Sequence, residues 1–307
     1  MRSAAAGRPA SAPHAPLLAI PSARALTPWA LLAPALVATS AVVFLPVLVT
    51  LWMSLHRFVL FEPRTTPFVG LANYASVIAD PTFWASLARS LVWIVGGVSL
   101  QFSLGFAAAL LLNRRFAWRG LARALIVIPW ALPSVIIGLI WTWMLDFNLG
   151  VINTLLVRLD LFAHPIAWLA QPDTAMIAVI LALTWQGFPF FAVTLLAGLQ
   201  GIPREHYEAA SIDGAGAFGA FRHVTLPGLA PVMATALLLR MIWVANSLDL
   251  IFIMTGGGPG TATETLPLYA FLKAWTGLDY GYGSALAVML TLLLLAVVAI
   301  YTLRDSG

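Results

Sequence analysis

Polar and aromatic side chains gather near the end of one long apolar stretch of this 307-residue chain and could contact a hydrophilic ligand. The group consists of Arg240, Trp243, Asn246, Ser247 and Asp249. Asn and Asp side chains suit hydroxyl donors, and a Trp ring suits the apolar face of a sugar. Polar residues inside a membrane usually face a water-filled path or a partner helix. The group therefore predicts a path for a hydroxylated solute, or bonds from Arg240 and Asp249 to neighbouring helices. Both interpretations stay open.

A continuous helix through this stretch would place the side chains in a definite pattern. Arg240, Trp243 and Ser247 would share one face, and Asn246 would lie on its flank. Arg240 and Asp249 would lie on opposite faces and about 14 Å apart along the axis, so they could not pair within the helix.

A second candidate for the same path lies in an earlier apolar stretch. Trp185 and Gln186 are adjacent there, and Pro189 follows them closely. Because proline cannot donate a helical hydrogen bond, this stretch could be kinked beside the pair.

Metal and nucleophilic chemistry find little support. The chain has no Cys, which excludes disulfides, thiolate metal sites and cysteine nucleophiles. The side chains of His56, His164 and His206 have no partner at metal-ligand spacing. The carboxylates are too scattered to form a hydrolytic pair. We therefore predict no metal and no catalytic residue in this chain.

ATP binding is not expected in this chain either. A phosphate-binding loop of the G-x-x-x-x-G-K-[ST] type is absent, and the single lysine, Lys273, lies elsewhere. The glycine-rich run at 256–260 carries no lysine and is better explained as a turn. Any ATP that drives this protein must be bound by a separate subunit.

The composition is that of a membrane protein. Hydrophobic residues make up 61% of the chain and charged residues 9%, whereas soluble domains contain about 25% charged residues. The 12 Trp and 17 Phe suit the crossings and interfacial belts of a polytopic membrane protein. A soluble fold could not cover its surface with so few charges.

Six stretches are long and apolar enough to cross a bilayer as helices. They lie at about 28–54, 86–112, 124–145, 174–199, 229–254 and 281–303. The tail before them, 1–27, is rich in Ala, Pro and Ser and is predicted to be disordered. The fold class is thus an all-α membrane domain over 28–307 with six transmembrane helices.

The distribution of basic residues predicts the orientation. One side of the membrane would hold Arg2, Arg8, Arg24, Arg114, Arg115, Arg119, Arg123, Arg204, Arg222 and Arg304. The other side would hold Arg57, Arg64, Arg158 and Lys273. Because basic loops stay inside, both termini are predicted to be cytoplasmic. The high isoelectric point, about 9.8, then follows from membrane topology and requires no nucleic acid partner.

The predicted cytoplasmic loop at 201–228 has features of a docking element. Pro203 suits a first helical turn, and a short helix is expected from Glu205 to Asp213. Gly214 would end that helix in a left-handed conformation. A second short helix is expected to follow, leading to Pro227 at the entry to span five.

Two roles fit this loop. It could lie on lipid headgroups, which Arg204 and Arg222 would favour. An anionic leaflet would, however, repel Glu205, Glu208 and Asp213. A short helix with small residues and an exposed carboxylate fits better into a groove of a partner protein.

The same loop resembles the EAA signature of the binding-protein-dependent ABC importer permeases. Glu208-Ala209-Ala210 is followed after three residues by Gly214 and after nine more by Val224-Thr225-Leu226-Pro227. Only Val224, in place of Ile, departs from the pattern. Segments such as 126–145 and 248–275 resemble the sugar branch, the maltose and glycerol-3-phosphate type. The resemblance extends from about residue 28 to the end and points to the first of two paired permeases.

The resemblance implies roles for individual residues of the loop. Glu208 would make a charged contact with a cytoplasmic ATPase, Ala209 and Ala210 would allow close approach, and Gly214 would set the turn. Asp213, Leu226 and Pro227 belong to the same coupling loop. Separately, similar family members place a substrate-contacting stretch in span five.

The resemblance also implies the partners of the chain. They are a second permease subunit in a heterodimer, two copies of an ATPase that hold ATP and Mg, and an extracytoplasmic substrate-binding protein. The substrate would be a di- or oligosaccharide, a polyol or a glycerol phosphodiester, and the location the bacterial inner membrane. No cofactor is expected in this chain itself.

The outer loops at 56–85 and 255–280 would receive the binding protein, with acidic residues such as Glu264 and Asp279 facing it. An alternative function is a secondary transporter that uses Asp249 as an ion-coupled site. That alternative would leave the EAA-like loop unexplained.

Overall fold

The computed structural model describes residues 23–62 and 65–305, which form helices and loops without a β-strand among them. The chain divides into two compact units, Met1–Val49 and Thr50–Gly307. Helix α1 (Ala23–Thr39) continues through a π-helical turn, η1 (Ser40–Phe44), into α2 (Leu45–Ser54), and the boundary between the units falls within α2. The tail predicted to be disordered lies mostly outside the described residues, and α1 begins before its expected end at residue 27.

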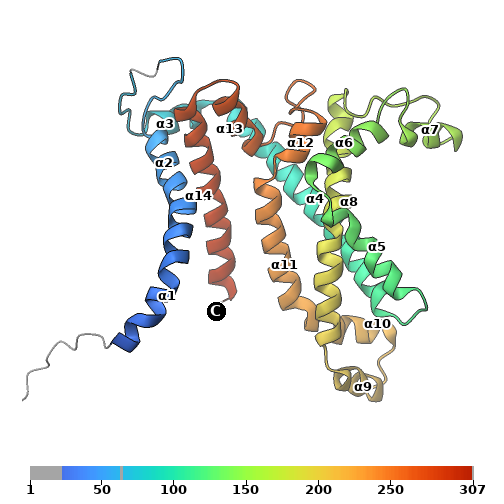
Figure 1. Ribbon diagram of the computed structural model, residues 1–307. Coiled ribbons are helices and arrows are strands. Elements are labelled where there is room, and N and C mark those ends of the chain that lie inside the picture. Colours follow the sequence, from blue (N-terminus) through green and yellow to red (C-terminus); the bar gives the residue numbers. More distant parts are fainter. Residues whose placement is uncertain (1–22, 63–64, 306–307) are drawn as a thin grey trace, which may run out of the picture. The chain divides into compact units, whose positions relative to one another are not determined.

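The second unit contains all the remaining helices. They are α3 (Ala72–Ala79), α4 (Pro81–Asn113), α5 (Arg119–Ala131), α6 (Ser134–Met144), α7 (Val151–Arg158), α8 (Pro172–Gly201), α9 (Arg204–Ile212), α10 (Ala217–Ala220), the π-helical η2 (Phe221–Thr225), α11 (Leu226–Asn246), α12 (Asp249–Met254), α13 (Leu266–Trp275) and α14 (Tyr280–Asp305) (Figure 1).

Five helical stretches in the described chain are long and apolar enough to cross a membrane. They are Leu31–Ser54, Pro81–Asn113, Pro172–Gly201, Ala217–Asn246 and Tyr280–Leu303. The pair α5 and α6 supplies a sixth span if it is counted as one, although the two helices meet at 96°. The prediction of an all-helical, multi-spanning protein is confirmed.

Two of the predicted spans were wrong in detail because each contains a break. The stretch 124–145 is split at Leu132 and Pro133, since a residue before proline avoids the helical conformation, and Leu132 has ψ 140°. The stretch 229–254 is split where α11 ends at Asn246, and Ser247 is extended with φ −80° and ψ 121°. Asp249 therefore opens a separate helix and does not share one with Arg240.

Helix α8 is the centre of the second unit. In the most apolar 18-residue segment of α8, 67% of the residues are buried, compared with 28% in the segment from α4 and 6% in the segment from α14. Helix α4 packs closely along it, and Gly105 of α4 makes the approach possible. A Cβ at Gly105 would lie 2.7 Å from the backbone oxygen of Phe188 and overlap the side chain of Phe191. The polar residues of α8 are thus held within a tightly packed bundle.

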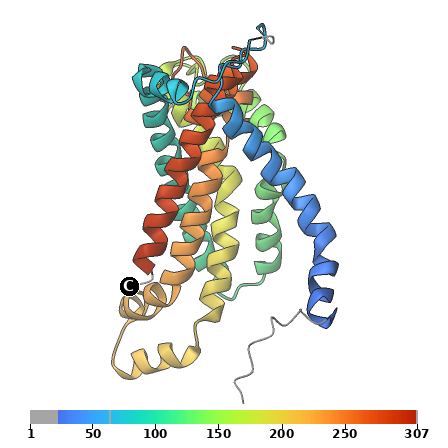
Figure 2. The same ribbon diagram turned by 90° about the vertical axis from the view of Figure 1, so that its left-hand side faces the viewer.

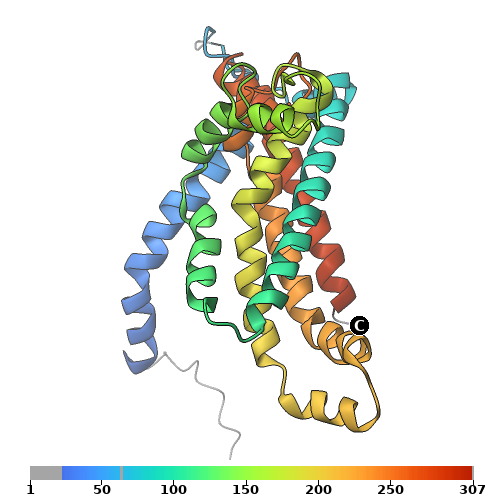
Figure 3. The ribbon, with the colours of Figure 1, turned by 90° about the vertical axis from the view of Figure 1, so that its right-hand side faces the viewer.

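The loops of the second unit lie at its two ends. Figures 2 and 3 show the loop between α4 and α5, the α9 hairpin and the C-terminal end of α14 at one end. The other end carries α3, α6, α7, α12 and α13. Successive loops thus lie in turn at one end and at the other, as expected of helices that cross a membrane one after another.

Candidate functional site

A cavity of about 330 Å³ lies where the two broken helices meet α8. Pro133 and Ser134 line it from the break between α5 and α6, and Ser247 lines it from the break after α11. Gln186 of α8 and Trp243 of α11 complete its polar and aromatic wall together with Arg240. The structure therefore brings Gln186, Arg240, Trp243 and Ser247 together, although they come from two predicted groups.

Arg240 has a partner on a neighbouring helix. Its Nε donates to Oε1 of Gln101 in α4 at 2.6 Å, and Nε2 of Gln101 donates to the backbone oxygen of Leu183 at 2.8 Å. Arg240 is only 8% exposed, and Gln101 is fully buried. Arg240 thus bonds to a neighbouring helix and also lines the cavity.

Gly187 makes room for this arrangement. A Cβ at this position would overlap Nη2 of Arg240 and the amide of Gln101. Neither group can move away freely, because both are buried between α4, α8 and α11. The glycine is thus a requirement of the Arg240–Gln101 bond.

Aromatic rings form one wall of the cavity. Trp243 and Trp130 line it and are 48% and 43% exposed. Phe190 lies between them, with ring centroids 5.2 Å from Trp243 and 5.9 Å from Trp130. Exposed indole faces of this kind suit the apolar face of a sugar ring.

Gln186 connects α8 to the start of α6. Its Nε2 donates to Oγ of Ser134 at 3.0 Å, directly after the break at Pro133. The helix α8 runs on unbroken through Pro189, so the kink that this proline could cause does not interrupt it.

Three of the predicted path residues lie outside this cavity. Trp185 packs against Trp141, with ring centroids 6.3 Å apart. Asn246 donates to the backbone oxygen of Ile242 at 2.8 Å and lines another cavity, of about 380 Å³. Asp249 is exposed in the first turn of α12. The break at Ser247 separates Asp249 from Arg240, whereas Asn246 lies in α11 with Arg240 and lines the other cavity.

Sequence reasoning missed Gln101, Gly187, Ser134 and Trp130. Gln101 carried a usable signal, because it is a polar residue in the middle of an apolar span, as Gln186 is. Ser134 and Trp130 carried none, since they reach the cavity only through the bend between α5 and α6.

The EAA-like loop forms a helical hairpin at one end of the second unit, and α12 lies at the other end. Helix α9 (Arg204–Ile212) is followed by Gly214, which has the predicted left-handed conformation with φ +81°, and the amide of Ala215 donates to the backbone oxygen of Ala210 at 2.9 Å. The hydroxyls of Tyr207 and Thr225 lie 3.1 Å apart and tie α9 to η2. The hairpin is thus closed at its turn and at its base.

The predicted coupling residues lie on two sides of this hairpin. Ala209, Ala210, Asp213 and Pro227 line a groove of about 700 Å³ beside α9. Glu208 is exposed in the middle of α9, and Leu226 is half-buried at the start of α11. An exposed carboxylate beside small residues is available to a partner protein.

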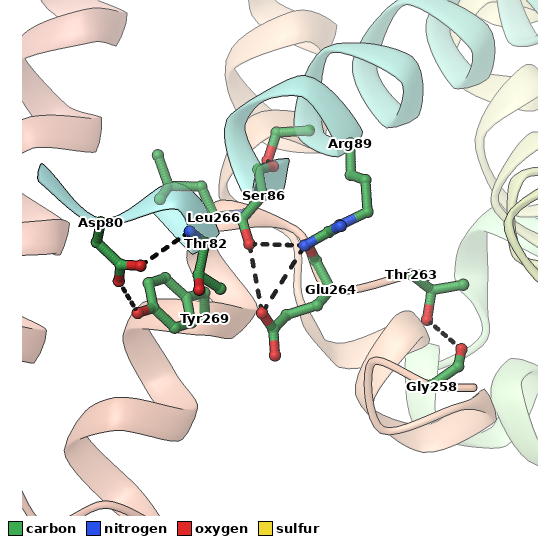
Figure 4. A network of polar contacts seen from close by, with 10 residues as sticks. Asp80, Thr82, Ser86, Arg89, Gly258, Thr263, Glu264, Leu266 and Tyr269 are labelled. Carbon is green, nitrogen blue, oxygen red and sulfur yellow. Dashed lines mark hydrogen bonds and ion pairs between the residues drawn. The ribbon is translucent and has the colours of Figure 1, made fainter. Parts of the chain in front are cut away.

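Carboxylates hold the other end of the unit together, and Figure 4 shows two of them, Asp80 and Glu264. Glu264 is 9% exposed, its backbone oxygen accepts from Nε of Arg89 at 2.9 Å, and its Oε1 lies 3.9 Å from Nη2 of Arg89. The side chain of Glu264 was expected to face outward, towards the binding protein, but it is buried. The carboxylate of Asp279 accepts from the amide of Tyr282 at 3.0 Å.

Asp80 joins three helices at this end. It accepts from the amide of Thr82 at 2.8 Å and from the hydroxyl of Tyr282 at 2.7 Å, and the hydroxyl of Tyr269 also donates to it. Burial alone would raise the pKa of Asp80, but the bonds from Tyr269, Tyr282 and Thr82 outweigh it and lower that pKa to about 2. Burial and the Asp80 bond raise the pKa of Tyr269.

A pH dependence of stability follows from Asp80. Because its pKa is lowered on folding, its stabilising contribution is complete above the ordinary value of 3.8 and is lost as the pH falls towards 2. We expect the melting temperature of the detergent-purified protein to exceed that of Asp80→Asn by a constant amount from pH 7 to about pH 5. The difference should shrink below about pH 4. A difference that grows on acidification would contradict this network.

The comparisons with known proteins agree with one another. Residues 101–306 match the model of the family described as "Binding-protein-dependent transport system inner membrane component". The trehalose/maltose transport system permease protein MalF of Thermococcus litoralis is 41% identical over 89% of this chain and 91% of its own length. The sulfoquinovosyl glycerol transport system permease protein SmoG of Agrobacterium fabrum is 38% identical, over 88% of this chain and 87% of its own.

A solved structure has the same fold. It is a chain of a bacterial ABC transporter involved in the import of the acidic polysaccharide alginate, and its TM-score is 0.80. The match covers 92% of this chain and 96% of that chain at 20% sequence identity. The transporter has also been solved in complex with a periplasmic protein that holds an alginate pentasaccharide.

Proposed function

This chain belongs to the family of binding-protein-dependent transport system inner membrane components, and we propose that it is the permease subunit of an ATP-driven carbohydrate importer. The cavity at the two helix breaks is the observation that carries the proposal. It combines an aromatic wall with hydrogen-bonding groups from Gln186, Arg240 and Ser247. Sugar sites need both features, since a sugar has apolar ring faces and hydroxyl edges.

We place the coupling to ATP at α9. Its exposed Glu208, its small residues Ala209 and Ala210, and the turn at Gly214 would fit a groove in a separate cytoplasmic ATPase. Two ATPase copies, each binding ATP and Mg, would serve this chain and a second permease subunit in a heterodimer. The end of the unit that carries α9 would then face the cytoplasm, in agreement with the positions of its Arg residues.

The extracytoplasmic end would receive a substrate-binding protein. The periplasmic partner of the alginate transporter supports such a component in assemblies of this fold. The loops around α3 and α13 are the surface available at this end, and the Asp80 and Glu264 networks would keep that surface rigid.

The transport cycle follows from these positions. Closure of the ATPase dimer on ATP would move the coupling helices together and turn the spans from inward- to outward-facing. A sugar released by the binding protein would enter the cavity, and hydrolysis would return the spans and release it inward.

A secondary transporter is not favoured. Asp249, its expected ion-coupled residue, is exposed at the start of α12 and does not line the cavity. The family membership and the EAA-like hairpin have no explanation in a transporter driven by an ion gradient.

Proteoliposomes test this function. We expect the complex of this chain with its second permease, ATPase and binding protein to take up a carbohydrate only when ATP is enclosed with the ATPase. Ionophores that collapse proton and sodium gradients should leave this uptake unchanged, because the energy comes from ATP. Uptake that is independent of ATP and abolished by ionophores would identify a secondary transporter instead.

A further inference from the structure

We propose that the cavity beside Arg240 binds an anionic group of the substrate, so that the transported carbohydrate is an acidic sugar. The group would be a carboxylate or another set of negatively charged oxygens. This inference rests on the proposed function and adds the chemical class of the substrate.

The charge of Arg240 is not compensated by an acidic side chain in the described part of the chain. The ion pairs found there join Arg57 to Glu62 and Arg89 to Glu264. The partner of Arg240 is Gln101, which is neutral. A buried cation without a counter-charge is costly inside a membrane bundle, and such residues commonly mark substrate or ion pathways.

The free donors of Arg240 are available to a ligand. A guanidinium has five N–H donors, and Arg240 uses the one at Nε for Gln101. That bond fixes the guanidinium, because Gln101 is itself held by the backbone oxygen of Leu183. Arg240 lines the cavity while remaining only 8% exposed, so the access to its remaining donors is through the cavity.

The other polar groups of the cavity also favour an anion. The wall contains no Asp or Glu, and Arg240 is its one charged residue. The 11-residue helix α6 begins at Ser134 on this wall, and no side chain caps its first turn. The positive end of that helix adds to the field of Arg240.

The arrangement also separates the two parts of an acidic sugar. Trp243 and Trp130 offer indole faces to the ring, and Arg240 with the start of α6 offers donors to the charged group. A carboxylate can accept two parallel bonds from a guanidinium, which neutral hydroxyls cannot match in strength.

Matched sugar pairs test this inference. The complete importer, trapped with ATP and vanadate in nanodiscs, would be titrated with glucose against glucuronate and cellobiose against cellobiouronate. We expect the acidic member of at least one pair to bind at least about tenfold more tightly, or ~1.4 kcal/mol. Arg240→Gln should remove the preference, and Arg240→Lys should keep part of it, which also shows that the site can fold without Arg240. Arg115→Gln, at an exposed arginine outside the cavity wall, is the matched control.

The possible results separate the two proposals. Equal binding of neutral and acidic sugars would overturn this inference and leave carbohydrate import standing. A preference that survives in Arg240→Gln would also overturn the role of Arg240. Failure of the proteoliposomes to take up any carbohydrate would contradict the proposed function and this inference together.

Discussion

Replacing Glu208 by Lys is expected to abolish transport while the protein still inserts and assembles. Glu208 is exposed in the middle of α9 and makes no ion pair among the described residues, so its loss costs the chain itself little. At a protein interface, bringing like charges together costs several kcal/mol, which corresponds to at least about a tenfold loss. ATP-driven uptake should therefore fall by that factor or more, and the ATPase should no longer respond to the substrate.

Glu62→Lys serves as the control for this prediction. It makes the same charge reversal at the other end of the unit, where Glu62 pairs with Arg57 at 3.6 Å and both side chains are more than half exposed. An exposed pair contributes little, so uptake should stay close to that of the wild type. Normal uptake in Glu208→Lys would show that α9 is not the coupling helix.

Replacing Gly187 by Ala is expected to have the second large effect. The added methyl group would overlap the guanidinium of Arg240 and the amide of Gln101, so it would force both out of their bond. Overpacking of this kind costs about 1–3 kcal/mol and would here deform the cavity as well. Uptake should fall at least about tenfold, and coupled ATPase activity should fall with it.

Gly120→Ala is the matched control, because a Cβ at Gly120 meets no atom within 4 Å. Its transport and its expression level should equal those of the wild type. If Gly187→Ala expresses well and transports normally, the Arg240–Gln101 bond is not part of the path. A comparison of melting temperatures distinguishes a deformed cavity from a protein that no longer folds.

The helical hairpin of the coupling loop could be predicted from the sequence because its boundaries are local. Pro203 and Gly214 have backbone preferences that suit the start and the end of a helix in almost any context. The structure places α9 between them, at Arg204–Ile212, and gives Gly214 a positive φ. The partner of this hairpin, in contrast, is supported by family resemblance and not by the geometry of a single chain.

The two helix breaks could be predicted only in part. Hydropathy measures the apolar character of a stretch, and it does not report the conformation of the backbone within it. Pro133 was a local signal for the first break. The second break, at Ser247, has neither proline nor glycine beside it, so tertiary packing determines it.

The candidate site shows the same limit. Arg240, Trp243 and Ser247 could be grouped because helical spacing relates them within α11. The break at Ser247 carries Asp249 into a separate helix, and Asn246, although in the same helix as Arg240, lines a different cavity. Gln101 could join them only once the packing of α4 against α8 and α11 was known.

Substrate protection of a single cysteine tests the central claim most directly. The chain has no Cys, so Ser247→Cys would provide its one thiol inside the cavity. Asn246→Cys, at the neighbouring residue that lines a different cavity, is the control. In the assembled importer, the sugar that drives ATP-dependent uptake should block thiol labelling at residue 247 and leave labelling at residue 246 unchanged. If that sugar protects neither thiol, or both equally, the cavity is not the path of the substrate.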